Sequence, residues 1–229
     1  MTTNVNKFIS SSGYCSRRQA DRLIKEGAVF LNGKKAVPTD KVNDSDTVEI
    51  NRKVISHTKP KHIYLAFNKP LGVISTSDKD SKNNIMDYIK IPDRVFPVGR
   101  LDVKSEGLIL LTNDGELTQQ ILKEKTVEKE YEVNVDKNID ETFLNHLRHG
   151  VMMEGRKTLP AKVKLLSERS FKIIIVEGRK RQIRRMCEMF HINVTKLVRT
   201  RIGQIKLEDI PVGKYKEISP TEIDKNFKS

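Results

Sequence analysis

One aspartate stands among cations in the stretch VFPVGRLDVKSEGLILL, residues 95–111. Asp102 lies between Arg100 and Lys104 and precedes a strongly apolar run at residues 108–111. Loops next to buried strands often present functional side chains, and neighbouring cations favour the ionised form of a carboxylate. An isolated R-x-D is nevertheless more often a turn residue with a surface partner. Asp102 is therefore a candidate nucleophile or base that needs partners elsewhere in the chain.

A tyrosine on a predicted strand is the first such partner. The stretch VEKEYEVNV, residues 127–135, alternates in the manner of a half-buried strand, which places Tyr131 with the valines and Lys129 on one face and the glutamates on the other. A core tyrosine is the simpler interpretation. An aromatic ring beside a carboxylate is also what a site needs in order to stack a pyrimidine base.

An arginine on a predicted amphipathic helix is the second. In EGRKRQIRRMCEMF, residues 177–190, apolar residues recur with helical spacing after a Gly178 turn. At 100° per residue Arg184 falls on the flank of the apolar stripe, so we expect it to be half buried and to reach into a site. The helix N-terminus adds donors for an anion. Cations predicted to face solvent or RNA phosphates here are Arg179, Lys180, Arg181 and Arg185.

The charge of the chain indicates a polyanionic partner. The 229 residues carry a formal net charge of +13, and such an excess favours nucleic-acid binding through counterion release. Residues 177–201 concentrate Lys and Arg with few acids among them, whereas a merely solvated face would interleave both signs. RNA is favoured over duplex DNA because a tyrosine beside an aspartate suits an everted base.

The N-terminal region is predicted to be a small basic domain. A short helix around Phe8 is followed by a second helix with a capping box at Ser16 and Gln19 and a stop at Gly27. An Asn32-Gly33 hairpin and a further strand follow. The cations expected to bind RNA here are Lys7, Arg17, Arg18, Arg22, Lys25, Lys34 and Lys35.

A polar, basic stretch at residues 51–62 is predicted to link this domain to a larger one. We place the RNA-binding domain with its linker at residues 1–58 and the catalytic domain at residues 59–229. The fold class is α+β, with a mixed sheet and helices packed on it. The predicted strands are 63–67, 108–111, 130–135, 161–166 and 171–176, and the predicted helices are 116–124, 141–149 and 181–190.

Several classes of protein are disfavoured by what the sequence lacks. No window approaches the apolar length of a membrane-spanning helix, and the first residues do not resemble a secretory signal, so we expect a cytoplasmic protein without a membrane partner. Cys15 and Cys187 fit neither a disulfide framework nor a zinc site. We expect a monomer that uses no cofactor and no metal.

Several motifs in order resemble those of the bacterial ribosomal RNA pseudouridine synthases of the RsuA/RluB/RluE/RluF family. They are NKPLGVIS (68–75), GRLD (99–102) with GLILLTNDGEL after it, KEYEV (129–133) and EGRKRQIRRM (177–186). Residues 6 to about 53 are similar to the small alpha-L, ribosomal-protein-type RNA-binding domain. The N-terminal region and RTRIGQIKLEDIPVGKY look most like the RluF branch, which modifies a uridine of large-subunit 23S rRNA. A structured tRNA loop stays open as a further substrate.

The resemblance implies a role for each candidate residue. Asp102 would be the catalytic aspartate, Tyr131 the ring that stacks on the uracil, and Arg184 the salt-bridge partner of Asp102. Arg100 would fill the space left by the flipped nucleotide or hold its phosphate, with Lys104 and Lys129 as further RNA contacts. Turning uridine into pseudouridine requires an ionised carboxylate in a dry pocket, acting as a nucleophile or as a base.

Two alternatives compete with this enzyme. One is a catalytically idle RNA-binding factor that assists ribosome assembly, which the presence of Asp102, Tyr131 and Arg184 disfavours. The other is a glycosidase or nuclease, which would usually need paired carboxylates or an acidic metal-binding cluster. The sequence leaves open which uridine is modified and whether naked RNA or an assembly intermediate is the substrate.

Overall fold

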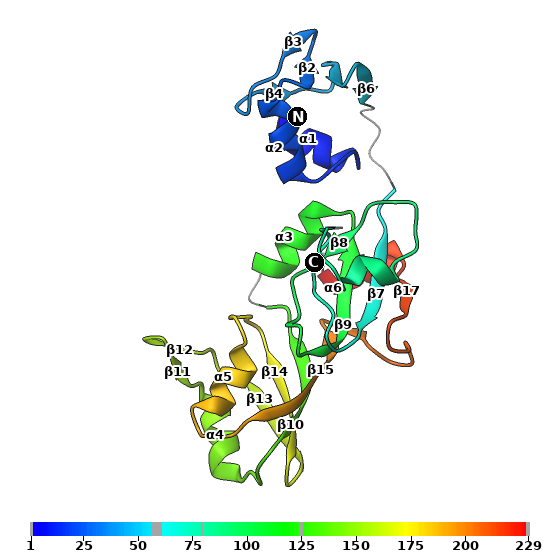
Figure 1. The fold of residues 1–229 in the computed structure, drawn as a ribbon. Helices are drawn as coiled ribbons and strands as arrows, with labels where there is room; N and C mark the ends of the chain where they lie inside the picture. The colour runs from blue at the N-terminus through cyan, green and yellow to red at the C-terminus, as the bar shows by residue number, and fades with distance from the viewer. Residues whose placement is uncertain (1, 56–60, 79, 124–125, 228–229) are drawn as a thin grey trace. The chain divides into compact units, whose positions relative to one another are not determined.

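The computed structural model describes residues 2–55, 61–78, 80–123 and 126–227. The chain divides into two compact units (Figure 1). The first unit comprises Met1–His62, Pro92–Arg94 and Asn113–Gly115, and the second unit comprises the remaining segments from Ile63 to Ser229. The predicted linker at residues 51–62 contains the strand β6, Lys53–Ile55, while residues 56–60 lie outside the described part.

The first unit packs two helices with short strands around its own core. Its elements are β1 (Thr3–Asn4), α1 (Val5–Ser11), α2 (Arg17–Lys25), β2 (Val29–Leu31), β3 (Lys34–Lys35), β4 (Lys41–Val42), β5 (Val48–Ile50) and β6. Helix α2 starts where predicted, because the Ser16 side chain accepts a hydrogen bond from the Gln19 backbone at 3.2 Å. Asn32 and Gly33 both adopt positive φ between β2 and β3, as a tight hairpin requires.

A mixed sheet organises the second unit. Its described strands follow the order β13-β14-β10-β15-β9-β7-β17, with β16 paired to β15 and β8 to β9. The contact between β15 and β9 is parallel, and the other pairings along this order are antiparallel. The strands are β7 (Tyr64–Lys69), β8 (Phe96–Pro97), β9 (Glu106–Thr112), β10 (Lys129–Val135), β13 (Lys162–Ser167), β14 (Ser170–Ile175), β15 (Val194–Ile202), β16 (Ile205–Lys206) and β17 (Tyr215–Glu217).

Helices cover both faces of this sheet and create two cores. Helices α4 and α5 pack on one face, with Tyr131, Val133 and Phe171 in the same core, and α3 and α6 contribute to the core on the other face with Leu108 and Leu110 (Figure 1). The helices are η1 (Ile85–Tyr88), α3 (Gly115–Lys123), α4 (Glu141–His149), α5 (Gln182–Glu188) and α6 (Pro220–Phe227), and a hairpin of β11 (Met152–Met153) and β12 (Arg156–Lys157) follows α4.

The expected α+β class with a mixed sheet is confirmed. Each predicted strand and helix of the second unit has a counterpart in the structure, although α5 spans fewer residues than the predicted helix 181–190. Strand β15 is not among the predicted strands, although it lies in the middle of the sheet between β10 and β9. No helix among the described residues is long and apolar enough to cross a bilayer.

Candidate active site

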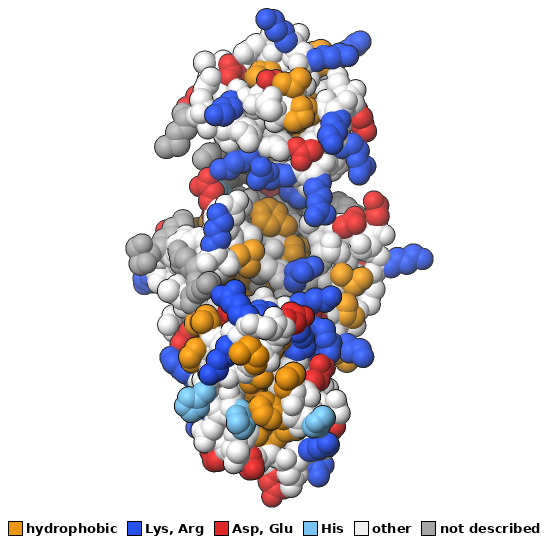
Figure 2. Space-filling view, turned by 90° about the vertical axis from the view of Figure 1, so that its left-hand side faces the viewer, with side chains coloured by type: hydrophobic (Ala, Val, Ile, Leu, Met, Phe, Trp, Pro, Cys, Tyr) orange, Lys and Arg blue, Asp and Glu red, His pale blue; other side chains and the backbone are white. Residues whose placement is uncertain are grey.

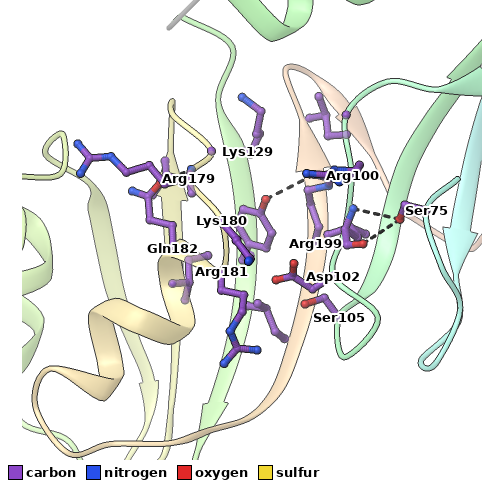
Figure 3. A pocket seen from close by; sticks show the side chains of 18 of the residues that line it. Ser75, Arg100, Asp102, Ser105, Lys129, Arg179, Lys180, Arg181, Gln182 and Arg199 are labelled. Atoms are coloured by element: carbon purple, nitrogen blue, oxygen red, sulfur yellow. Dashed lines mark hydrogen bonds between the residues drawn. The ribbon is translucent and has the colours of Figure 1, made fainter. Parts of the chain in front are cut away.

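A pocket of about 710 Å³ opens where the central strands meet the loop before β9 and the start of α5. This volume falls within the range of about 300–1,000 Å³ typical of small-molecule sites. Asp102 projects into the pocket toward the segment that carries Lys180 and Arg181 (Figure 3). The lining includes Ser75, Arg100, Asp102, Ser105, Lys129, Tyr131, Lys180, Arg181, Gln182 and Arg199. The fold therefore brings Asp102 and Tyr131, far apart in sequence, to one cavity.

The carboxylate of Asp102 has no protein partner among the described residues. Its backbone carbonyl accepts a hydrogen bond from Ser105 at 3.0 Å, which closes the turn before β9. The side chain itself is half-buried, and neither a hydrogen bond nor an ion pair engages it in the described part of the chain. An acid that serves only to cap a turn would spend its oxygens on nearby backbone N–H groups. Asp102 instead keeps both oxygens available to a ligand.

The motif NKPLGVIS braces the Asp102 loop from both sides. The buried Ser75 hydroxyl donates to the Leu101 carbonyl at 2.8 Å and accepts from the Leu101 N–H at 3.1 Å. On the other flank, the Gly72 N–H donates to the Val103 carbonyl at 2.8 Å. The residues directly before and after Asp102 are thus both fixed through their backbones, so the carboxylate is held in place without a contact of its own.

A buried lysine shapes that brace. Lys69 is fully buried at the end of β7, and its Nζ donates to the carbonyls of Pro70 and Val73, each at 2.8 Å. Burial lowers the pKa of Lys69 to about 8, although the charges of Glu106 and Asp102 favour its protonated form. Lys69 therefore closes the turn at residues 70–73 and adds positive charge near the catalytic candidate.

Tyr131 faces the pocket from β10, as the alternation predicted. It is 8% exposed and belongs to the core beneath α4 and α5. Its hydroxyl accepts a long hydrogen bond of 3.5 Å from Nη1 of Arg199, and the Arg199 guanidinium lies 6.0 Å from the ring centroid. The ring is fixed by its strand and by the core, which suits a stacking surface for a planar base.

Arg184 lies deeper than predicted and does not form an ion pair with Asp102 in the described structure. The side chain is 6% exposed rather than half-buried, because α5 packs this face onto the core. Its Nη1 donates to the Val194 carbonyl at 2.7 Å, and its Nη2 donates to the carbonyl of Lys104, two residues after Asp102. The negative charge of Asp102 still acts on Arg184. Arg184 therefore supports the loop through the Lys104 carbonyl, and it interacts with Asp102 through its charge rather than through a direct salt bridge.

The cations of the loops before α5 and β9 and of α5 itself divide into those that contact other protein groups and those that pair with no carboxylate of the described residues. Arg179 donates to the carbonyls of Arg156 and Lys157 at 2.9 and 2.7 Å, so it anchors the β11–β12 hairpin rather than facing open solvent. Arg181 pairs with Glu188 at 3.0 Å and Arg185 with Glu154 at 2.8 Å. Both arginines stay partly exposed in these pairs, so their predicted contact with RNA phosphates stays a prediction. Among the described residues no carboxylate pairs with the exposed Arg100, Lys104 or Lys180.

Lys129 lines the pocket but is not an open surface cation. Its Nζ donates to the carbonyls of Val127 and Val176, at 3.1 and 3.5 Å. Burial, and secondarily the charge of Arg199, lower the pKa of Lys129.

In the first unit the predicted RNA contacts are exposed, namely Lys7, Arg17, Arg18, Arg22, Lys25, Lys34 and Lys35. Figure 2 shows blue clusters of Lys and Arg on the visible face of each unit.

Three residues of the site were not singled out from the sequence. Ser75 and Lys69 lie in the recognised motif NKPLGVIS, but nothing in residue spacing tied that motif to Asp102. Arg199 falls within the basic cluster at residues 177–201, and no strand is predicted there that would place it inside the fold. The available signal was the run of apolar and β-branched residues among the cations of that stretch, namely Val194, Thr195, Leu197, Val198, Thr200 and Ile202.

The comparisons with known proteins agree with this arrangement. Residues 63–189 match the RNA pseudouridylate synthase family, and residues 4–48 match the S4 domain. The chain is 45% identical over 99% of its length to the dual-specificity RNA pseudouridine synthase RluF of Escherichia coli, covering 79% of that protein. It is 38% identical to the ribosomal large subunit pseudouridine synthase B of Bacillus subtilis, with 96% of this chain and 93% of the relative covered.

A solved structure is similar in fold over most of the chain. The crystal structure of a pseudouridylate synthase superposes with a TM-score of 0.71 at 28% sequence identity, covering 97% of this chain and 98% of that one. The family match includes Asp102, Tyr131 and Arg184. From its sequence, its fold and its pocket, the chain belongs to the RNA pseudouridylate synthase family and carries an S4 domain at its N-terminus.

Proposed function

We propose that this protein isomerises a specific uridine to pseudouridine in large-subunit ribosomal RNA, with Asp102 as the catalytic carboxylate. The observation that carries the proposal is the Asp102 side chain, which enters a pocket among cations while its oxygens have no partner in the described structure. Tyr131 offers a rigid ring in the same pocket. A stacked base and an available carboxylate are the two elements that the reaction needs.

The reaction exchanges one bond to the sugar for another. The N1–C1′ bond of uridine breaks, the base turns on the Tyr131 ring, and a C5–C1′ bond forms. The proton on C5 is lost and N1 gains one, so no atom enters or leaves overall. Asp102 starts this sequence either by attacking as a nucleophile or by removing a sugar proton. Arg184 and Lys69 lie close enough to Asp102 for the charge of its carboxylate to favour their protonated forms.

Base flipping brings the uridine to Asp102, because the carboxylate lies within a pocket rather than on an open surface. Arg100 and Lys180 are exposed at its rim and supply charge for the RNA backbone. The exposed cations of the first unit add a second RNA-binding surface, as its S4 match suggests. The ribosomal substrate is supported by the name of the Bacillus relative.

The test compares Asp102→Asn with the wild type on large-subunit RNA fragments. We expect the substitution to abolish pseudouridine formation while RNA binding falls by less than about tenfold, because the carboxylate acts in the transition state. Asp209→Asn is the matched control, since Asp209 is exposed and does not line the pocket. Full activity of Asp102→Asn would refute the assignment. A wild type that binds RNA but forms no pseudouridine would identify an assembly factor instead.

Mapping pseudouridine in a deletion strain identifies the substrate. We expect one site in 23S rRNA to lose its modification and to regain it with the wild-type gene but not with Asp102→Asn. Loss of a tRNA site in the same strain would extend the substrate class to tRNA. Light scattering and cell fractionation test the further proposals that the protein is a monomer and acts in the cytoplasm.

A further inference from the structure

Arg199 is a buried cation of the pocket to which the proposed mechanism assigns no role. Its side chain is 4% exposed, lines the cavity beside Tyr131, and forms no ion pair with a carboxylate of the described chain. Its Nε donates to the Leu108 carbonyl at 2.6 Å, while Nη2 is buried and has no hydrogen-bond partner there. A buried cation without a counter-charge is costly, and such groups concentrate at functional sites.

A β-bulge aims Arg199 into the pocket. On β10 and β15, Tyr131 is opposite Arg199 but Glu130 is opposite Arg201, so the register shifts by one residue between the two pairs. Without the shift both arginines would share a face, because side chains two apart on a strand point the same way. With it, Arg201 pairs with Glu128 and Glu130, whereas Arg199 joins Tyr131. Bulges beside active sites commonly redirect a side chain in this way.

The surroundings of Arg199 suit an anion. Its charge contributes to the lowered pKa of both Lys69, which is buried, and Lys129, which lines the pocket, so Arg199 lies within electrostatic reach of two further cations. The guanidinium is anchored at Nε, but the contact of Nη1 with the Tyr131 hydroxyl is long. The end of the guanidinium that carries Nη1 and Nη2 can therefore turn toward a stronger acceptor. A uracil on the Tyr131 ring presents two carbonyl oxygens, and its ring becomes anionic when the N1–C1′ bond breaks with its electrons on N1.

We propose that Arg199 is a catalytic residue, whose Nη2 donates to a carbonyl oxygen of the uracil and stabilises the negative charge of the detached base. The proposal rests on the proposed isomerisation of uridine. It assigns to Arg199 the part that an oxyanion hole has in acyl transfer, namely a prepositioned donor for charge that develops during reaction. Arg199 also retains the base, because the contact strengthens once the base is no longer held by the sugar.

The test is a chemical double-mutant cycle with the full-length protein. RNA substrates carry uridine, 2-thiouridine or 4-thiouridine at the target position, since sulfur is a weaker acceptor than oxygen. Single-turnover rates and RNA affinities are measured for the wild type, Arg199→Met and Arg199→Lys. Arg201→Met is the matched control, because it removes an arginine from the same strand but the opposite face.

We expect Arg199→Met to lower the single-turnover rate on the order of 100-fold, as loss of one such donor does elsewhere, while RNA affinity stays nearly unchanged. For one of the two thio substrates, the ratio of the uridine rate to the thiouridine rate should be smaller in this variant than in the wild type by about fivefold or more. Arg201→Met should show no such coupling. If Arg199→Met does not fold, the same cycle on Arg199→Lys, whose single amine replaces the fork, gives the coupling.

Equal thio effects in the wild type and in the Arg199 variants would overturn the role of Arg199, since a merely structural residue would slow all three substrates alike. A wild type that leaves uridine unchanged would refute the proposed function, and this inference with it. An active wild type without coupling at either carbonyl would refute this inference alone.

Discussion

Replacing Ser75 by alanine should impair catalysis although Ser75 is a buried residue outside the chemistry. Its hydroxyl holds both the N–H and the carbonyl of Leu101, the residue before Asp102. Removal leaves two buried backbone groups without these partners, and each orphaned group costs about 1–3 kcal/mol. We expect a loss of about 2–4 kcal/mol in the free energy of unfolding, because the loop relaxes and water reaches part of it. A displacement of Asp102 by about 1 Å would lower the catalytic rate on the order of 100-fold.

The assay pairs urea unfolding with single-turnover pseudouridine formation at saturating enzyme. Ser77→Ala is the control, since Ser77 lies on the same segment and forms no side-chain hydrogen bond in the described structure. RNA affinity should stay unchanged, because Ser75 acts through the loop. A variant with the wild-type rate despite the loss of stability would show that the brace does not position Asp102.

Three further outcomes follow from the structure. Gly107→Ala should unfold or inactivate the protein, because φ is +100° and the new Cβ would lie 2.4 Å from the Arg199 carbonyl oxygen. Gly155→Ala also places a side chain at positive φ, +72°, but with open space around it. Equal shifts of the melting temperature for the two variants would show that the close approach of Arg199 at Gly107 does not matter. In the folded protein Lys69 has a pKa of about 8, below its ordinary value of 10.5. Between pH 8 and 10.5 the unfolded chain therefore keeps a proton that the folded protein has released. The free energy of unfolding consequently rises with pH over this window. Relative to Lys69→Met, the wild type should become more stable over that window by up to about 3 kcal/mol, and urea unfolding that shows no such trend would contradict the burial of a charged amine. Changing the three arginines of α2 to glutamine should flatten the salt dependence of RNA binding, with each lost phosphate contact reducing the slope by about 0.7–0.9, and an unchanged slope would remove α2 from the RNA interface.

Elements with strong local signals were predictable from the sequence. Helix α4 spans the predicted residues, since Asp140 caps it at Phe143 and apolar residues recur at helical spacing. The alternation of β10 placed Tyr131 inward correctly. Strand β15 was missed because cations interrupt its apolar residues. Because β15 is central in the sheet, Arg199 and Arg201 contact groups of the neighbouring strands. The local sequence pattern of a strand does not predict which strands will lie beside it.

The position of Arg184 was predictable to within a helix face, but its contacts were not. A helical projection placed it on the flank of the stripe, and the structure buries it against the carbonyls of Val194 and Lys104. Those acceptors belong to segments 10 and 80 residues away in sequence. The partner of a buried guanidinium is therefore set by tertiary packing, which the periodicity of a single helix does not contain.

The same limit changes the interpretation of the net charge. Even a correct assignment of β15 would have put Arg199 and Arg201 on one face, because the strand period is two. The bulge that separates them becomes evident only from the register with β10. Arg199 then contributes to the pocket and Arg201 to an ion-pair network, so neither is available for RNA phosphates. A count of basic residues in this region consequently overestimates the phosphate contacts, and the salt dependence of RNA binding should reflect the smaller set of exposed cations.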